Sequence, residues 1–170
     1  MKPWMSVRDV SFLTELFKLW HMTVFEWGSG GSTIYFKDKT RKWLSIEHDP
    51  LWYHRIKELG GNVLLCQNNK IYTNRGFGAF DVILIDGRDR NDCIYAADKL
   101  LFNDRSLILV HDGRRKHYHD AAQSFLWHRK VGDDFLVMSK KEPGGAVLEV
   151  LLKFGLRDFS EPSVPWDPEH

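Results

Sequence analysis

A glycine-rich run that follows an acidic residue is the first feature of the sequence that could bind a ligand. Residues 24–33 read Val-Phe-Glu-Trp-Gly-Ser-Gly-Gly-Ser-Thr, where an apolar run gives way to a possible helix start. Glycines let the backbone approach a ligand closely, and free amides at a helix start attract its acidic groups. Glu26 stands just before the glycines, where a carboxylate repels a phosphate but attracts an ammonium group. A turn without a ligand is the alternative for such a loop.

A second acid, Glu47, ends the next apolar run about twenty residues later. A carboxylate at that point can accept hydrogen bonds from both hydroxyls of a ribose, although a solvated carboxylate is the simpler reading. Thr33 stands where G-x-G-x-x-G has its third glycine, which departs from the usual pyrophosphate fingerprint. Glu26 and the missing third glycine therefore count against a dinucleotide ligand.

Charged residues follow two later apolar runs, as Asp86-Gly-Arg-Asp-Arg90 and His111-Asp-Gly-Arg-Arg115. Open parallel sheets bind ligands outside the carboxyl ends of their strands, so Asp86 and Asp112 are candidate catalytic residues. His111 could take a proton near neutral pH. Helix caps, surface ion pairs and a structural histidine are the alternatives.

Arginines cluster at the same two strand ends. Arg88, Arg90 and Arg114 could bind a carboxylate or phosphate of a substrate through paired donors. A solvated rim that neutralises the neighbouring aspartates explains them equally well.

The spacing of apolar residues predicts the elements that position these side chains. Five buried parallel strands are expected, over 23–27, 43–47, 62–66, 80–85 and 106–111. Amphipathic helices are expected over 6–20, from Asp49-Pro50 to Gly60, near 90–102 and near 116–130. Residues 67–79 show no helical stripe and are expected to form an irregular loop.

The last part of the chain predicts an antiparallel pair. Residues 135–139 and 147–154 look like strands, joined by Lys140-Lys-Glu-Pro-Gly-Gly145. The predicted fold class is therefore α/β: a doubly wound, mostly parallel seven-stranded sheet with helices on both faces and a C-terminal antiparallel hairpin. We expect one domain over residues 1–159 and an irregular tail over 160–170.

Three segments together resemble a known family. The runs E-W-G-S-G-G-S-T, S-I-E-H-D-P and F-D-V-I-L-I-D-G, in this order and spacing, are similar to the motifs of Rossmann-like (class I) S-adenosylmethionine-dependent methyltransferases. The resemblance covers about residues 23–154. It implies S-adenosylmethionine as cofactor, held by Glu26, Gly28, Ser29, Gly30, Gly31, Ser32, Glu47, His48, Gln67, Asp86 and Gly87. Within this set Glu26 would lie near the cofactor's amino group, Glu47 at its ribose and His48 beside its adenine.

The pattern is also similar to the catechol and caffeoyl-coenzyme A O-methyltransferases. This resemblance implies that Asp86 and Asp112 could hold a divalent metal such as magnesium. Gly113 stands where those enzymes have an asparagine ligand, so the set is incomplete and metal dependence is in doubt.

Composition limits the partners. Lys and Arg total 24 against 23 for Asp and Glu, so no overall field attracts nucleic acid or an anionic membrane. No secretory signal or membrane helix is evident, which predicts a cytoplasmic protein. Cys66 and Cys93 fall in apolar runs and are expected to be buried thiols rather than a disulfide.

The leading hypothesis is an enzyme that methylates an unidentified small molecule, on oxygen rather than nitrogen. An NAD-dependent oxidoreductase shares the strand, the glycine loop and the distal acid. A non-catalytic protein that binds the cofactor or a partner is the third alternative, because the short chain leaves little material for a substrate lid. The oligomeric state cannot be read from the sequence.

Overall fold

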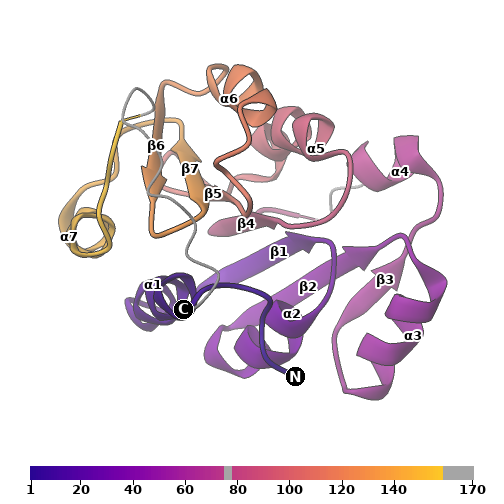
Figure 1. The fold of residues 1–170 in the computed structure, drawn as a ribbon. Helices are drawn as coiled ribbons and strands as arrows, with labels where there is room; N and C mark the ends of the chain where they lie inside the picture. The colour runs from indigo at the N-terminus through magenta and orange to yellow at the C-terminus, as the bar shows by residue number, and fades with distance from the viewer. Residues whose placement is uncertain (75–77, 159–170) are drawn as a thin grey trace.

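The computed structural model describes residues 1–74 and 78–158, which form a seven-stranded sheet with helices on both faces (Figure 1). The strand order is β3-β2-β1-β4-β5-β7-β6. The strands are β1 (Thr23–Trp27), β2 (Lys42–Glu47), β3 (Val63–Leu65), β4 (Val82–Ile85), β5 (Leu107–Val110), β6 (Trp127–Val131) and β7 (Phe135–Ser139). The first five are parallel, and β7 pairs antiparallel with both β5 and β6. The predicted fold class is confirmed.

The helices divide between the two faces of the sheet. In chain order they are α1 (Val7–Lys18), α2 (Gly31–Phe36), α3 (Pro50–Glu58), α4 (Asn69–Asn74), α5 (Arg90–Ala97), α6 (His117–Ala122) and α7 (Gly145–Lys153), with 3-10 turns η1 (Lys37–Lys39) and η2 (Asp98–Leu100). Helices α4, α5 and α6 share one core with the sheet. Helices α1, α2 and α7 share the other, and α3 lies beside α2 (Figure 1).

The predicted starts of two helices are confirmed. The Ser6 hydroxyl accepts a hydrogen bond from the Asp9 amide at 3.0 Å and caps α1. The Asp49 carboxylate accepts one from the Trp52 amide at 2.9 Å, and Pro50 opens α3. Side-chain oxygens satisfy amides that have no partner within a first helical turn, which explains why these two boundaries could be read from the sequence.

The irregular loop predicted for residues 67–79 is wrong in its first half, where α4 forms. The Asn68 side chain accepts from the Ile71 amide at 3.1 Å, and Tyr72 is buried against the sheet. A single buried turn has too few apolar positions to produce a periodic stripe.

The assignments after residue 116 also need correction. The predicted helix over 116–130 ends at Ala122, because Trp127–Val131 forms β6, the outer strand of the sheet. Charged residues are common on edge strands, and here His128, Arg129 and Lys130 interrupt the apolar run that would have indicated a strand. Residues 147–154 lie mostly in α7 rather than in a strand, so the antiparallel pair is β6 with β7.

Two smaller predictions concern the cysteines and the tail. Cys66 and Cys93 are buried free thiols, as expected. The tail predicted for residues 160–170 lies outside the described residues. Within residues 1–74 and 78–158, no helix has the length and apolar character needed to cross a membrane.

Candidate functional site

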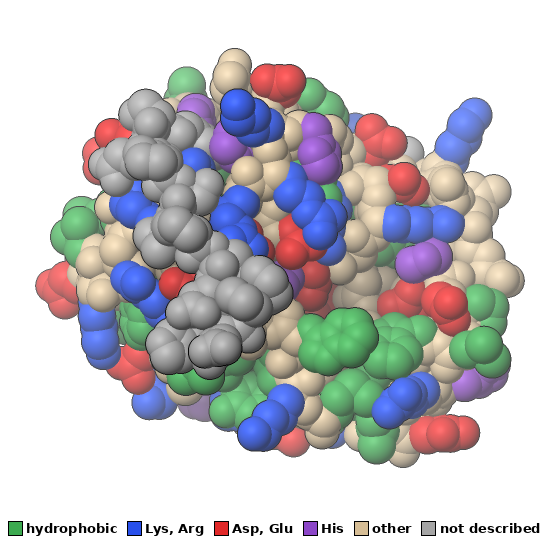
Figure 2. Space-filling view, viewed as in Figure 1, with side chains coloured by type: hydrophobic (Ala, Val, Ile, Leu, Met, Phe, Trp, Pro, Cys, Tyr) green, Lys and Arg blue, Asp and Glu red, His purple; other side chains and the backbone are tan. Residues whose placement is uncertain are grey.

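Two adjacent cavities of about 570 Å³ each open at the carboxyl ends of the parallel strands. We call the first the β2-side cavity; it is lined by Gly28, Ser29, Glu47, His48, Asp49, Leu51, Trp52, Arg55, Asp86, Gly87 and Arg88. The second, the β5-side cavity, is lined by Met1, Lys2, Trp4, Glu26, Gly28, Ser29, Gly30, Gly31, Ser32, Trp52, Arg55, Asp86, Arg90, His111 and Asp112. Figure 2 shows a hollow on this face, with basic side chains above it, acidic ones within it and a hydrophobic patch below.

Two glycines allow the ends of β1 and β4 to touch between the cavities. Gly28 has a left-handed backbone with φ of +87°, and a β-carbon there would lie 2.6 Å from the Gly87 amide nitrogen. A β-carbon on Gly87 would lie 2.1 Å from the Tyr72 hydroxyl. Glycine is required at both positions because the Gly87 backbone occupies the space of a side chain at Gly28, and the buried Tyr72 hydroxyl and the Gly28 backbone occupy it at Gly87.

Glu47 holds the glycine loop in place. Its carboxylate accepts hydrogen bonds from the amide of Ser29 at 2.8 Å and from the Ser29 hydroxyl at 2.9 Å. The other oxygen accepts from the amides of His48 and Asp49 at 2.8 and 3.0 Å. Glu47 is therefore fixed at the wall of the β2-side cavity, next to His48.

Glu26 is fully buried beneath α2. Its carboxylate interacts with the hydroxyls of Ser32, Thr33 and Ser45 and with the Trp43 indole N–H, the last at 2.8 Å. Burial raises the pKa of Glu26 to about 7, although the hydrogen bonds from these partners oppose the shift. The side chain borders the β5-side cavity but is already held by its neighbours.

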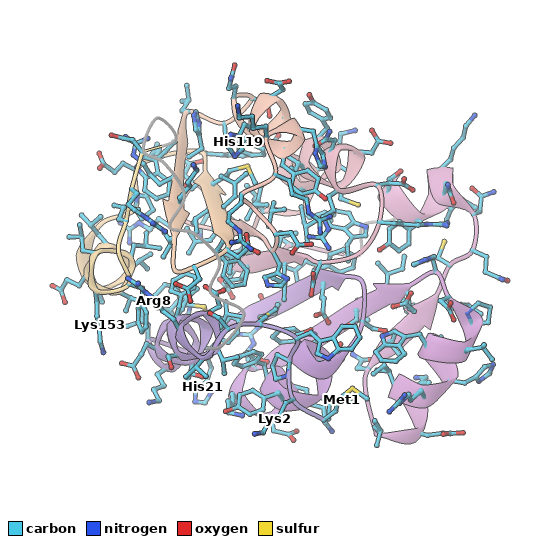
Figure 3. All side chains as sticks on the ribbon, in the orientation of Figure 1. Met1, Lys2, Arg8, His21, His119 and Lys153 are labelled. Atoms are coloured by element: carbon cyan, nitrogen blue, oxygen red, sulfur yellow. The ribbon has the colours of Figure 1, made fainter. Side chains whose placement is uncertain are left out.

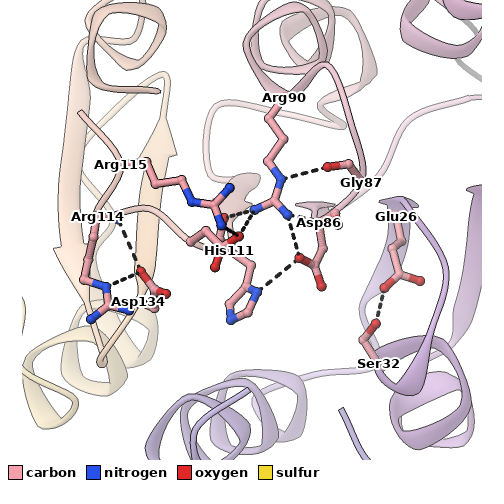
Figure 4. A network of polar contacts seen from close by, with 10 residues as sticks. Glu26, Ser32, Asp86, Gly87, Arg90, His111, Arg114, Arg115 and Asp134 are labelled. Atoms are coloured by element: carbon pink, nitrogen blue, oxygen red, sulfur yellow. Dashed lines mark hydrogen bonds and ion pairs between the residues drawn. The ribbon is translucent and has the colours of Figure 1, made fainter. Parts of the chain in front are cut away.

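Asp86 and His111 form a carboxylate–histidine pair on the β5-side cavity (Figure 4). His111 Nδ1 lies 3.1 Å from Asp86 Oδ1, so Nε2 is the ring nitrogen that does not contact Asp86. Burial alone would lower the pKa of His111, but the hydrogen bond to Asp86 and the charges of Asp86, Asp112 and Asp134 outweigh it, and the pKa is raised. Such a pair can orient an imidazole for proton transfer.

Arg90 links the ends of β4 and β5. Its Nη2 lies 3.2 Å from Asp86 Oδ1 and its Nη1 lies 3.1 Å from Asp112 Oδ2. Further donors reach the backbone carbonyls of Asp86, Gly87 and His111. Arg115 contacts the same oxygen of Asp112 at 2.8 Å. Arg90 therefore lines the cavity, but its N–H groups already bind carboxylates and backbone carbonyls of the protein.

The remaining predicted site residues differ in position. Arg88 lines the β2-side cavity and donates to Asn69 Oδ1. Arg114 pairs with Asp134 at 3.0 Å and is not among the residues that line either cavity. Gln67 is exposed and also lies outside both linings, although its carbonyl accepts from Arg88 at 3.4 Å.

The sequence analysis missed Trp52 and Arg55 as site residues. Trp52 reads as part of the buried stripe of α3, but it is only half-buried and lines both cavities, with its indole N–H donated to the Ser29 carbonyl. Arg55 lies over the Trp52 ring, 5.3 Å from its centroid. The sequence did contain a signal for these two residues. The helix α3 begins at Pro50, three residues after Glu47, so its first turn lies at the same edge of the sheet as the Glu47 carboxylate.

The segment before α1 was also missed. Met1, Lys2 and Trp4 line the β5-side cavity, and a β-carbon on Gly31 would lie 2.0 Å from the Lys2 carbonyl oxygen. Figure 3 labels Met1 and Lys2 where the chain passes α2. Nothing in the spacing of residues 1–5 predicts this contact.

Comparisons with known proteins identify the fold. The sequence matches no protein-family model and no curated protein. The structure is similar to a methyltransferase-like protein from Silicibacter pomeroyi, with a TM-score of 0.65 and 20% identity over 90% of this chain and 96% of that one. It is also similar to the N-methyltransferase NodS from Bradyrhizobium japonicum, solved with S-adenosyl-L-homocysteine, with a TM-score of 0.58 and 13% identity over 81% and 86% of the two chains. The T. thermophilus 16S rRNA N2 G1207 methyltransferase, solved with AdoMet and guanosine, has a TM-score of 0.60 and 12% identity over 81% of this chain and 44% of that one.

Proposed function

We propose that this protein is a methyltransferase that uses S-adenosylmethionine, and its fold is the Rossmann-like fold of the methyltransferases described above. One observation carries the proposal: Glu47 fixes the glycine loop at the point where the two cavities meet. A nucleoside with a charged amino-acid arm needs two connected compartments of this kind. We assign the β2-side cavity to the adenosine and the β5-side cavity to the methionine arm and the methyl acceptor.

The residues of the β2-side cavity suit an adenosine. Glu47 can accept a hydrogen bond from a ribose hydroxyl if the cofactor displaces the Ser29 hydroxyl, since a carboxylate has about four acceptor positions and four protein donors now use them. His48 and Trp52 supply ring surfaces on the same wall. Gly28 and Gly87 keep the boundary between the cavities free of side chains.

The residues of the β5-side cavity suit the methionine arm. Glu26 borders this cavity, and in its ionised form it can stabilise an ammonium group and repel the phosphates of NAD, which favours S-adenosylmethionine as the ligand. The short helix α2 follows the glycine loop, so amides of its first turn are available to a carboxylate.

Asp86 and His111 supply the acid–base chemistry in this proposal. S-adenosylmethionine provides an activated methyl group, and transfer to a hydroxyl forms a carbon–oxygen bond as the carbon–sulfur bond breaks. His111 Nε2 would accept the hydroxyl proton while Asp86 holds Nδ1. Aspartate thereby stabilises the imidazolium that forms.

We favour an oxygen acceptor because a hydroxyl must lose its proton to react, whereas a neutral amine already has a nucleophilic lone pair. We favour a small molecule because the nearly balanced charge of the chain provides no overall field that attracts nucleic acid. Lys2, Arg55 and Arg90 line the β5-side cavity, to which we assign the acceptor, and Arg88 lines the β2-side cavity beside it.

Isothermal titration with S-adenosylhomocysteine and NAD, side by side, tests the cofactor assignment. Binding of S-adenosylhomocysteine in the micromolar range with no binding of NAD supports it. The reverse pattern would replace it with an oxidoreductase. A turnover assay over a panel of hydroxyl and amine acceptors then separates an enzyme from a protein that only binds the cofactor.

A further inference from the structure

We propose that the Arg90 guanidinium occupies the place of a divalent cation between Asp86 and Asp112, so that methyl transfer at this site needs no metal. The inference rests on the proposed function, and it addresses the metal site suggested by the two aspartates. Arg90 is a positioning residue in this account, because it acts on Asp86 and Asp112 rather than on the acceptor.

The geometry of the guanidinium is that of a bridging cation. One terminal nitrogen lies 3.2 Å from Asp86 Oδ1 and the other lies 3.1 Å from Asp112 Oδ2. The two aspartates follow different strands, β4 and β5. Figure 4 shows the guanidinium between the two loops. A metal that used both carboxylates would have to displace it.

Backbone contacts make this displacement costly. Arg90 Nε donates to the Gly87 carbonyl at 2.8 Å, Nη2 also reaches the Asp86 carbonyl at 3.2 Å, and Nη1 donates to the His111 carbonyl. The side chain is only 11% exposed. Each of its three nitrogens thus has an acceptor at one of the two strand ends, a fork geometry that a lysine or a metal cannot reproduce.

The charges at this edge already balance. Asp112 is paired with Arg115 as well as with Arg90, at 2.8 Å. Two carboxylates and two guanidinium groups leave no net negative charge to attract a cation. The asparagine ligand expected from the metal-dependent enzymes is Gly113, where a β-carbon would lie 2.4 Å from the Leu136 amide nitrogen, so a ligand side chain cannot be accommodated there.

The described residues contain one other group with metal-ligating atoms close together, His111, Asp112 and Asp134. Both carboxylates of this group are paired with arginines. Asp112 is paired with Arg90 and Arg115, and Arg114 binds Asp134 through two contacts of 3.0 and 3.2 Å. The arginines therefore neutralise this group too, and Asp86 stays available to orient His111.

Manganese binding tests the proposal without an acceptor. Electron paramagnetic resonance of free Mn²⁺ would be measured with the wild-type chain, Arg90→Ala, Arg90→Lys and the double variant Arg90→Ala with Asp112→Asn. We expect the wild type and Arg90→Lys, which keeps the positive charge, to bind no Mn²⁺ at this site. Arg90→Ala should bind it with an affinity at least about tenfold above any binding by the wild type, since Asp86 and Asp112 lose the guanidinium that bridges them, although Asp112 keeps Arg115. The double variant should lose that gain.

Two results would overturn the inference. One is Mn²⁺ binding by the wild type that Asp86→Asn or Asp112→Asn abolishes, a comparison that does not depend on whether Arg90→Ala folds. The other is a folded Arg90→Ala variant that binds Mn²⁺ no better than the wild type. S-adenosylhomocysteine binding, measured in the same samples, reports separately on the proposed function: its absence in the wild type removes that function and leaves the manganese comparison intact.

Discussion

The buried carboxyl group of Glu26 gives the free energy of unfolding a pH dependence that one substitution should remove. Its pKa rises from 4.5 to about 7 on folding because burial disfavours the charged form. Between these values the folded chain keeps a proton that the unfolded chain has released. The contribution of Glu26 to stability is therefore complete below pH 4.5 and falls as the pH rises toward 7.

The size of this loss follows from the shift. One pKa unit corresponds to about 1.4 kcal/mol, so ionisation of Glu26 at pH 8 costs about 3 kcal/mol relative to pH 4. Glu26→Gln keeps the shape of the side chain and is neutral at every pH. The hydroxyls of Ser32, Thr33 and Ser45 can each donate or accept, so they can adapt to the amide.

Urea denaturation followed by circular dichroism, at pH 4.5, 6 and 8, measures the effect. The stability of Glu26→Gln relative to the wild type should increase by about 3 kcal/mol over this range. Glu15→Gln is the control: Glu15 is half-buried, and its hydrogen bonds to Lys18 and Lys153 lower its pKa. Because the stability that a lowered carboxyl pKa contributes is lost mainly below pH 4.5, its relative stability should change little over this range, and in the opposite direction. A difference between Glu26→Gln and wild type that stays constant with pH would refute the reasoning, because Glu26 would then ionise normally while buried.

Three further outcomes test the site. Glu47→Ala should weaken S-adenosylhomocysteine binding by roughly 1.5–3 kcal/mol in isothermal titration, the loss expected for hydrogen bonds to a charged group; unchanged affinity in a folded variant would place the ribose elsewhere. Gly87→Ala should lower the free energy of unfolding by roughly 1–3 kcal/mol in urea titrations, because its β-carbon meets the Tyr72 hydroxyl, whereas Gly144→Ala, with open space around it, should change little. Asp86→Asn should lower the pKa of His111, as followed by NMR of the imidazole protons, and a pKa that does not move would show that the pair is not coupled.

The sequence was sufficient to predict the parallel half of the sheet. Each of its five strands forms an apolar run, and all but the edge strand β3 are buried along most of their length. The acids at or next to the ends of β1, β2 and β4 mark their carboxyl ends. The parallel direction of these strands follows from the same pattern, because helical connections join parallel strands. Their order does not follow from it, since β4 lies beside β1 and not beside β3. The two cavities therefore lie at the predicted edge.

The C-terminal part was harder to predict because local signals there conflict with packing. Val147, Val150 and Leu151 are buried at helical spacing, yet their β-branched and leucine side chains also suit a strand. Trp127–Val131 includes Arg129 and Lys130, which are typical of helix surfaces and of edge strands alike. Only the pairing of β6 with β7 distinguishes the two readings.

Contacts across the sheet edge could not be predicted at all. The bridge from Arg90 to Asp112 joins residues from different strand ends, and its distances depend on how α5 packs. The contact between Lys2 and Gly31 depends on the path of an irregular segment. Neither contact is indicated by a periodic pattern of residues in the sequence.

The position of Met1 has a practical consequence for work with this protein. Because Met1 and Lys2 belong to the wall of the β5-side cavity, any residues joined to the N-terminus emerge beside the glycine loop. A histidine-rich purification tag placed there would bring imidazoles and metal affinity to the very cavity in which His111 and manganese are to be measured. Protein for the titrations should therefore carry a removable tag.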